Sequence, residues 1–199
     1  MPILYYVHDP MCSWCWGFRP VWMEVISRLP PDIKIQYVLG GLAADTDQPM
    51  PETMQVSIAN TWHSIQTEIP GIEFNFDFWT KCQPRRSSYA SCRAVIAAGS
   101  QNKEQEMLLA IQQAYYLQAL NLSNDDTLIE LAKQLNMDSL QFKYDLNSNA
   151  TAEKLLKEFE LRDALYVHSF PAIVLDQQHT IKIDYNNANN ILKQIHLLL

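Results

Sequence analysis

Two cysteines lie three residues apart near the start of the chain, within the stretch Asp9–Gly17, DPMCSWCWG. The apolar run at 3–7 before them predicts a buried strand, and a helical pattern follows them. Cysteines at this spacing between a strand and a helix are typical of a redox site. If the helix begins near Cys12, the free N–H groups and dipole of its N-terminus favour a thiolate there. Cys15 then lies one turn further on, on the same side, within reach of a disulfide.

An ordinary thiol has a pKa near 8.5, so only about 3% of it is ionised at pH 7. A helix N-terminus stabilises an anion by at most about 2 kcal/mol. Backbone N–H groups around the sulfur must therefore contribute as well, and Ser13 and Trp14 set their geometry. The alternative chemistry is half of a zinc site, since CxxC pairs also bind metal. A helix N-terminus after a strand suits a thiolate better, so we expect no metal.

The 199-residue chain carries a formal charge of −7, and 48% of its residues are hydrophobic. These values predict a globular protein with one core, or one domain with an insertion. The acidic balance and the lack of a basic cluster argue against nucleic acid and anionic membranes as partners. No apolar run approaches the ~20 residues of a membrane span.

The first residues show neither a basic region nor the small-residue cleavage site of a signal peptide. We therefore expect the chain as given to be cytoplasmic. Four cysteines in this length do not form a disulfide scaffold. In a reducing cytosol, a CxxC pair is more often catalytic than structural.

Hydrophobic periodicity predicts the order of the elements. Pro30 and Pro31 end the first helix, and the strand at 33–39 follows, with Val38 on its less buried face. Strand, helix and strand make a parallel, right-handed unit. The predicted helices that follow lie near 51–69, 87–99, 107–115, 124–135, 140–146 and 155–159, with an extended segment at 74–78. Ser87 or Ser88 is the expected cap of the second of them.

The end of the chain predicts a hairpin of strands at 172–175 and 180–183, then a helix at 191–198. This order resembles an α/β thioredoxin-like fold interrupted by a helical domain. With its CxxC motif, the chain resembles the DsbA-type thiol–disulfide oxidoreductases, specifically the cytosolic FrnE-like branch. The resemblance implies a thioredoxin-like domain of residues 1–45 plus 165–199, and an inserted helical domain of residues 46–164.

The second matching motif is Ser169-Phe170-Pro171, directly before the third strand. The resemblance implies a cis-proline loop facing the cysteines, and Pro171 matches by position. An X–Pro bond can be cis at modest cost, and a proline at a strand start need not donate to the ladder. Such a turn would present the backbone of Phe170 to an extended peptide. The alternative is an ordinary trans turn.

Exchange chemistry assigns the roles of the pair. We expect Cys12 to be the exposed nucleophile that forms a mixed disulfide, and Cys15, which is less accessible inside the first turn, to resolve it. Trp14, Trp16 and Phe18 are expected to form an apolar rim for unfolded peptide. Core packing is an equally good prediction for Trp16 and Phe18.

His168 precedes Pro171 by three residues, so it is a candidate to approach the sulfurs as a cation that favours the thiolate. The alternative is a loop histidine without this role. His8 and Asp9 adjoin the CxxC motif, but the sequence does not indicate where their side chains point.

Two further groups have alternative interpretations. Cys82 and Cys92 are two buried, unpaired thiols, or a second redox pair. Arg85, Arg86 and Arg93 form a solvated face, or a site for a carboxylate or glutathione.

The sequence therefore predicts a thiol–disulfide oxidoreductase, a reductase or isomerase of protein disulfides using Cys12-Ser13-Trp14-Cys15. Its partners would be protein or peptide thiols and disulfides, with no cofactor beyond the cysteine pair and glutathione as a candidate electron donor. The alternative enzyme is a glutathione-dependent transferase of the kappa class or a 2-hydroxychromene-2-carboxylate isomerase. Those families carry a serine at the first motif position, so Cys12 argues against them. A metal- or peptide-binding module is a third class. The oligomeric state is not predicted.

Overall fold

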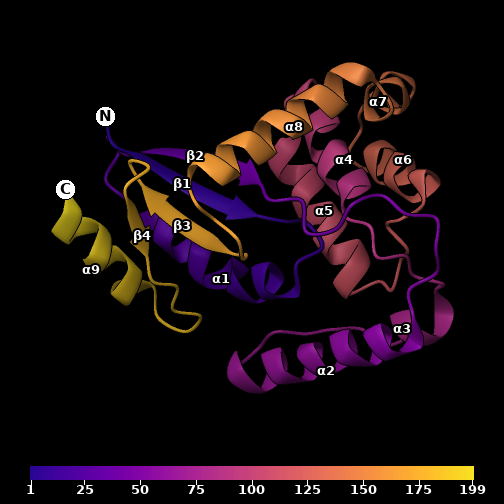
Figure 1. The fold of residues 1–199 in the computed structure, drawn as a ribbon, viewed down its shortest axis with the longest axis horizontal. Coiled ribbons are helices and arrows are strands. Elements are labelled where there is room, and N and C mark those ends of the chain that lie inside the picture. Colours follow the sequence, from indigo (N-terminus) through magenta and orange to yellow (C-terminus); the bar gives the residue numbers. More distant parts are fainter.

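A four-stranded sheet forms the centre of one half of the molecule, in a computed structural model that describes residues 1–199 (Figure 1). Its strand order is β2-β1-β3-β4. The strands are β1 (Ile3–His8), β2 (Lys34–Leu39), β3 (Ala172–Leu175) and β4 (His179–Ile181). β1 and β2 are parallel, whereas β3 is antiparallel to both β1 and β4. The predicted parallel unit and the predicted hairpin are confirmed.

Helices α1 (Ser13–Arg28) and α9 (Ala188–Leu198) pack against each other and cover one face of the sheet. Phe18 and Trp22 of α1 lie in the same core cluster as Ile191 of α9. Burying these large side chains against the sheet is the main force that fixes α1, and with it the start of the helix, on the sheet.

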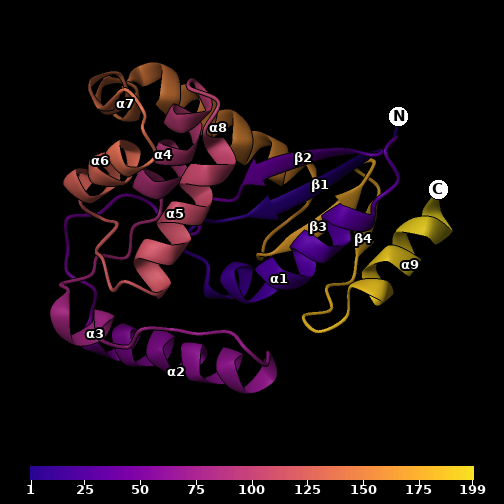
Figure 2. The ribbon, with the colours of Figure 1, turned by 180° about the vertical axis from the view of Figure 1, so that it is seen from behind.

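The other helices all lie between β2 and β3 in the sequence. They are α2 (Glu52–Glu68), α3 (Phe78–Lys81), α4 (Tyr89–Gly99), α5 (Glu104–Tyr116), α6 (Asp125–Gln134), α7 (Ser139–Leu146) and α8 (Asn149–Ala164). Most of them gather beside the sheet, whereas α2 and α3 lie along the edge of the molecule (Figure 2). The predicted α/β sheet with an inserted helical segment is thus confirmed. None of the helices combines the length and the apolar character that crossing a bilayer requires.

The second face of the sheet is also covered, and this overturns the predicted burial pattern of β2. Val38, expected on the less buried face, is fully buried. It packs with Val7, Leu165 and Val174 beneath the end of α8, which lies against β2. Because helices cover both faces here, strict alternation fails at the end of the strand.

Two local predictions are also wrong. Phe78 does not continue the extended segment but begins the short helix α3. Ser88 occupies the N-cap of α4, but its side chain makes no capping hydrogen bond. Its hydroxyl instead donates to a carboxylate oxygen of Asp9, 2.7 Å away. The Ser88 hydroxyl therefore bonds to the buried carboxylate of Asp9 and does not cap the N-terminus of α4.

Candidate functional site

Cys12 is the N-cap of α1, as the sequence predicts. Its backbone is extended, with φ −82° and ψ 116°, and the helix begins at Ser13. The N–H of Cys12 donates to the carbonyl of Asp9 at 3.1 Å, and the N–H of Trp16 donates to the carbonyl of Cys12 at 3.1 Å. The sulfur therefore lies at the positive end of the helix, where an anion is stabilised. The side chain of Cys12 accepts no capping hydrogen bond, so the predicted N–H contacts to the sulfur are not formed.

The Cys12 thiol faces the loop before β3. Only 6% of the Cys12 surface is exposed, so the predicted exposed position of this thiol is wrong. Its sulfur donates to the carbonyl oxygen of Phe170 at 3.5 Å, and the Phe170–Pro171 peptide bond is cis. The ring of Phe170 lies against the backbone of Gly40, where an added Cβ would be 2.2 Å from a ring carbon. Only glycine allows this approach, so Gly40 helps to hold Phe170 beside the sulfur.

Cys15 lies one turn behind Cys12 and is almost completely buried, with 1% of its surface exposed. Burial raises the pKa of the Cys15 thiol well above its usual range, and a hydrogen bond with the Cys12 thiol raises it further. All four cysteines of the chain are free thiols. Cys15 therefore requires stabilisation of its charged form before it can act as a nucleophile.

Asp9 is a fully buried carboxylate that ties the motif to the rest of the protein. One carboxylate oxygen accepts the N–H of Met11 at 2.8 Å. The other accepts the N–H of Leu42 and the hydroxyl of Ser88, both at 2.7 Å, and the thiol of Cys92 at 3.5 Å. Burial raises the pKa of Asp9, and these hydrogen bonds oppose the rise. The sequence offered one signal for this role, an Asp placed directly after a strand and before a turn. The groups that Asp9 contacts in α4 and after β2 are distant in sequence, so this signal could not identify them.

Ser13 and Trp14 lie where the motif meets other elements. The hydroxyl oxygen of Ser13 accepts the indole N–H of Trp62, from α2, at 2.8 Å. Trp14 is half-buried, and its ring centroid lies 5.0 Å from that of Tyr185. The motif is thus in contact with α2 on one side and with the segment before α9 on the other.

Trp16 and Phe18 belong to the core, so they do not form the predicted apolar rim. Trp16 stacks on Tyr116, donates its indole N–H to the carbonyl of Glu73 at 3.1 Å, and is 9% exposed. Phe18 is fully buried beneath the sheet. Tyr116 of α5 covers one face of the Trp16 ring. Of the three predicted rim residues, only Trp14 remains partly accessible.

His168 is exposed and makes no hydrogen bond to either sulfur. The segment after α8 alternates, with Leu165 and Val167 buried and His168 facing solvent. This alternation directs the imidazole away from the interior, so the structure does not bring it into contact with the cysteine pair.

The two other cysteines have separate surroundings. Cys92 is fully buried, and its partner is Asp9. Cys82 is half-buried and donates to the carbonyl of Ala119 at 3.1 Å. Burial raises the pKa of both thiols. These contacts favour two unpaired structural thiols rather than a second redox pair.

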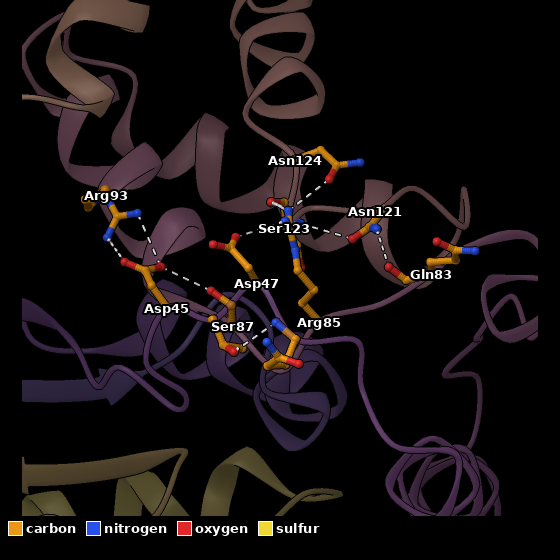
Figure 3. A network of polar contacts seen from close by, with 11 residues as sticks. Asp45, Asp47, Gln83, Arg85, Ser87, Arg93, Asn121, Ser123 and Asn124 are labelled. Carbon is orange, nitrogen blue, oxygen red and sulfur yellow. Dashed lines mark hydrogen bonds and ion pairs between the residues drawn. The ribbon is translucent and has the colours of Figure 1, made fainter.

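The arginine cluster is engaged by the chain's own polar groups (Figure 3). Arg93 donates to both carboxylate oxygens of Asp45, at 2.6 and 3.3 Å, and Ser87 donates to the same carboxylate at 3.1 Å. A bidentate pair of this kind is among the stronger polar contacts in proteins. The guanidinium of Arg93 is therefore already neutralised by a carboxylate from the segment after β2.

Arg85 is similarly engaged. It donates to the carbonyl of Ser123 and to the side-chain oxygen of Asn124 at 3.0 Å, and it lies 3.5 Å from Asp47. A polar cleft of about 680 Å³ adjoins both arginines. Both arginines are thus paired within the chain and partly exposed at this cleft, and their predicted roles, a solvated face or a site for a carboxylate or glutathione, stay predictions. Arg86 makes no ion pair.

Metal coordination has no evident place in the structure. No group of three or more His, Cys, Asp or Glu side chains is arranged so that it could hold an ion. Cys12 and Cys15 alone could supply only half of a tetrahedral zinc site.

Comparison with known proteins adds sequence relatives. A protein-family model described as thioredoxin matches residues 5–194. The ClpXP adapter protein SpxH of Halalkalibacterium halodurans is 25% identical over 177 residues, covering 86% of this chain and 57% of that protein. SpxH of Bacillus subtilis is 22% identical over 180 residues, covering 88% of this chain and 59% of that protein. The chain spans less than two thirds of the length of these relatives.

Solved structures share the fold over nearly the whole chain. A protein from Nitrosomonas europaea described as a disulfide isomerase has a TM-score of 0.84 at 24% identity, covering 98% of this chain and 96% of that one. The cytosolic disulfide reductase DsbM of Pseudomonas aeruginosa, solved with GSH, has a TM-score of 0.78 at 19% identity, covering 99% and 100%. DsbA of the same organism has a TM-score of 0.62 at 15% identity, covering 98% and 80%. The predicted resemblance to DsbA-type folds is confirmed.

Proposed function

The chain belongs to the thioredoxin family, and from this premise we propose that it is a thiol–disulfide oxidoreductase that reduces or isomerises protein disulfides through Cys12 and Cys15. One observation carries the proposal. Cys12 occupies the N-cap position of α1, its sulfur lies 3.5 Å from the carbonyl oxygen of Phe170, and a second thiol, that of Cys15, lies one turn further along the helix. A helix N-terminus supplies the charge stabilisation that a thiolate nucleophile needs.

The reaction follows from this arrangement. The Cys12 thiolate attacks one sulfur of a client disulfide, so a Cys12–client disulfide forms and a client thiolate leaves. Cys15 then loses its proton and attacks the Cys12 sulfur. The Cys12–Cys15 disulfide forms, and the second client sulfur leaves as a thiolate that takes up a proton. The client gains two electrons, and two molecules of glutathione would restore the dithiol as they form glutathione disulfide.

The surroundings of Cys12 suit a polypeptide client. The carbonyl of Phe170 already accepts a hydrogen bond from the thiol, so the backbone of this loop is directed at the reaction site. An extended client could pair with that backbone as an added strand. The half-buried rings of Trp14 and Tyr185 offer an apolar contact for a client side chain nearby.

The direction of exchange depends on the compartment. We infer a cytosolic reductase or isomerase, as the name of the P. aeruginosa disulfide reductase suggests for a protein of the same fold. A reducing cytosol would keep the pair mostly as thiols. Equilibrating the protein in glutathione buffers of graded ratio would give the reduction potential of Cys12–Cys15 and so decide between a reductase and a net oxidant.

The direct test is turnover of a disulfide-linked fluorescent peptide dimer with glutathione as reductant. We expect Cys12→Ser to reduce turnover by at least about 1,000-fold, because the nucleophile is lost. Cys82→Ser is the matched control, since this half-buried thiol lies outside the site, and it should retain full activity. Full turnover by Cys12→Ser would reject the proposal.

A second candidate function is that of a protein adapter. The observation that favours it is the sequence similarity to SpxH, whose name is that of a ClpXP adapter. An adapter needs a docking surface rather than thiols. Binding to ClpX by a Cys12→Ser/Cys15→Ser double variant, combined with no peptide turnover by the wild-type chain, would favour the adapter. Absence of binding together with turnover would favour the enzyme.

A further inference from the structure

A small cavity lies beside Cys15, away from the contact between Cys12 and Phe170. Its volume is about 10 Å³, which is roughly the room that one water molecule needs. Cys15, His8, Arg19 and Gln112 are among the residues that line it, whereas Cys12 and the loop before β3 are not. Exposed side chains of α1 and α5 also line it, so the cavity lies close to solvent.

Arg19 is an unpaired cation in this cavity. It follows Cys15 by four residues on α1, so the two side chains project from the same face of the helix. The guanidinium is half-buried, and its one hydrogen bond goes to the amide oxygen of Gln112, at 3.4 Å. No carboxylate lies within 4 Å of it, whereas Arg28 on the same helix pairs with Glu24 at 2.6 Å. A partly desolvated charge without a counterion is costly, so an anion formed nearby is stabilised.

The other titratable groups around Cys15 supply no positive charge. They are Cys12, Asp9, His8, Tyr6, Tyr37, Tyr116 and Tyr185. Burial, together with the charge of Arg19, lowers the pKa of His8 to about 3, so this imidazole is neutral at pH 7. Burial raises the pKa of each of the four tyrosines, so they stay uncharged. The Asp9 carboxyl, when ionised, opposes a second negative charge. Arg19, which lines the same cavity as Cys15, is therefore the one cation among these groups.

We propose that Arg19 stabilises the thiolate of Cys15 during resolution of the mixed disulfide, and that a water molecule in the cavity carries the Cys15 proton to solvent. The proposal rests on the proposed function. Cys15 loses its proton to this water, and its sulfur forms a bond with the Cys12 sulfur. The bond between Cys12 and the client sulfur breaks, and the client thiolate takes a proton from solvent.

Polar atoms suited to hold this water are present. The Nδ1 atom of His8 is buried and has no hydrogen-bond partner. The indole N–H of Trp22, which lines the same cavity, is also buried and has no partner. The amide of Gln112 is a third candidate partner. A buried water is normally held by two to four such groups. The site therefore offers both the charge and the proton path that a nearly inaccessible thiol lacks.

The test is the decay of a preformed mixed disulfide between Cys12 and a fluorescent thiol, followed by release of the dye across a range of pH. We expect Arg19→Met to slow this decay about tenfold at pH 7, since an opposite charge nearby favours a thiolate by one pKa unit or more. The deficit should shrink as the pH rises and deprotonation no longer limits the rate. Arg19→Lys should keep most of the wild-type rate. Arg28→Met, which removes a paired arginine from the same helix, is the matched control and should decay as wild type does.

A second variant keeps the test decisive if Arg19→Met does not fold. Gln112→Glu keeps the size of the side chain but gives Arg19 a carboxylate partner, so it should slow the decay in the same direction. Wild-type decay rates in both Arg19→Met and Gln112→Glu would overturn the role of Arg19 while leaving the proposed function intact. If the wild-type protein fails to form the mixed disulfide at all, the proposed function fails instead.

Discussion

The two cysteines lie one helical turn apart, yet their surroundings differ. Cys12 is at the start of α1, and its sulfur contacts the carbonyl of Phe170. Cys15 is 1% exposed and lies beside a small cavity that also contains Arg19 and His8. We call these the loop side and the cavity side of the pair. Two identical side chains therefore have different surroundings: Cys12, 6% exposed, faces the loop before β3, whereas Cys15, 1% exposed, lies behind it.

The largest expected effect separates the two sulfurs. Cys15→Ser should leave nucleophilic attack intact but block resolution, so mixed disulfides with client proteins should accumulate. Cys12→Ser should form none, because Cys15 is less exposed than Cys12, at 1% against 6%, and lies one helical turn behind it. Non-reducing electrophoresis and mass spectrometry of protein incubated with a disulfide client would show the difference. If both variants formed equal amounts of mixed disulfide, Cys12 and Cys15 would not have the different roles proposed for them.

The next effect concerns the cavity side and acid stability. Burial lowers the pKa of His8 to about 3 in the folded protein, against about 6.5 in an unfolded chain. Between these values the unfolded state binds the extra proton, so stability falls as the pH drops through this window. From pH 7 to pH 4 the histidine should account for a loss of about 3 kcal/mol.

Urea unfolding at both pH values would measure this loss. His8→Phe keeps an aromatic ring against Tyr6, on which His8 stacks at 5.1 Å, and removes the titration. The variant should therefore lose about 3 kcal/mol less than the wild type over this range. An identical acid loss in both proteins would show that His8 is not held neutral by its surroundings.

The smallest effect concerns the loop side. In Gly40→Ala the new methyl group would meet the Phe170 ring, so the ring and its carbonyl must shift away from Cys12. We expect a loss of about 1–2 kcal/mol in stability and slower peptide turnover. Gly99→Ala is the control, because its nearest neighbours, atoms of Glu104, would lie at 3.4 Å or more. Unchanged turnover in Gly40→Ala would show that Phe170 does not position a client.

The sequence predicted most of the fold because periodicity and turn residues are local signals. The start of α1 at the cysteine pair and the final hairpin followed directly from such patterns. The division of the chain after residue 45 and before residue 165 stays a prediction. Val38 was misplaced because α8, from a distant part of the chain, covers the second face of β2.

The site was less predictable because its details depend on contacts between distant segments. No local pattern shows that Tyr116 covers Trp16, or that Asp9 meets groups from the segment after β2 and from α4. The cavity side was missed for the same reason, although the alternation of β1 places His8 on the same face as Tyr6. Pairs far apart in sequence set the chemistry here, and a single sequence does not reveal them.

The pairing of β1 with β3 joins segments that are far apart in the sequence, and the N–H of Ile3 donates to the side chain of Asp176, 173 positions away. During translation the ribosome releases the cysteine pair well before the loop containing Phe170. Contacts of such long range form late in folding. A nascent chain therefore carries two unshielded thiols until β3 emerges, and its correct maturation depends on surroundings that keep these thiols reduced until then.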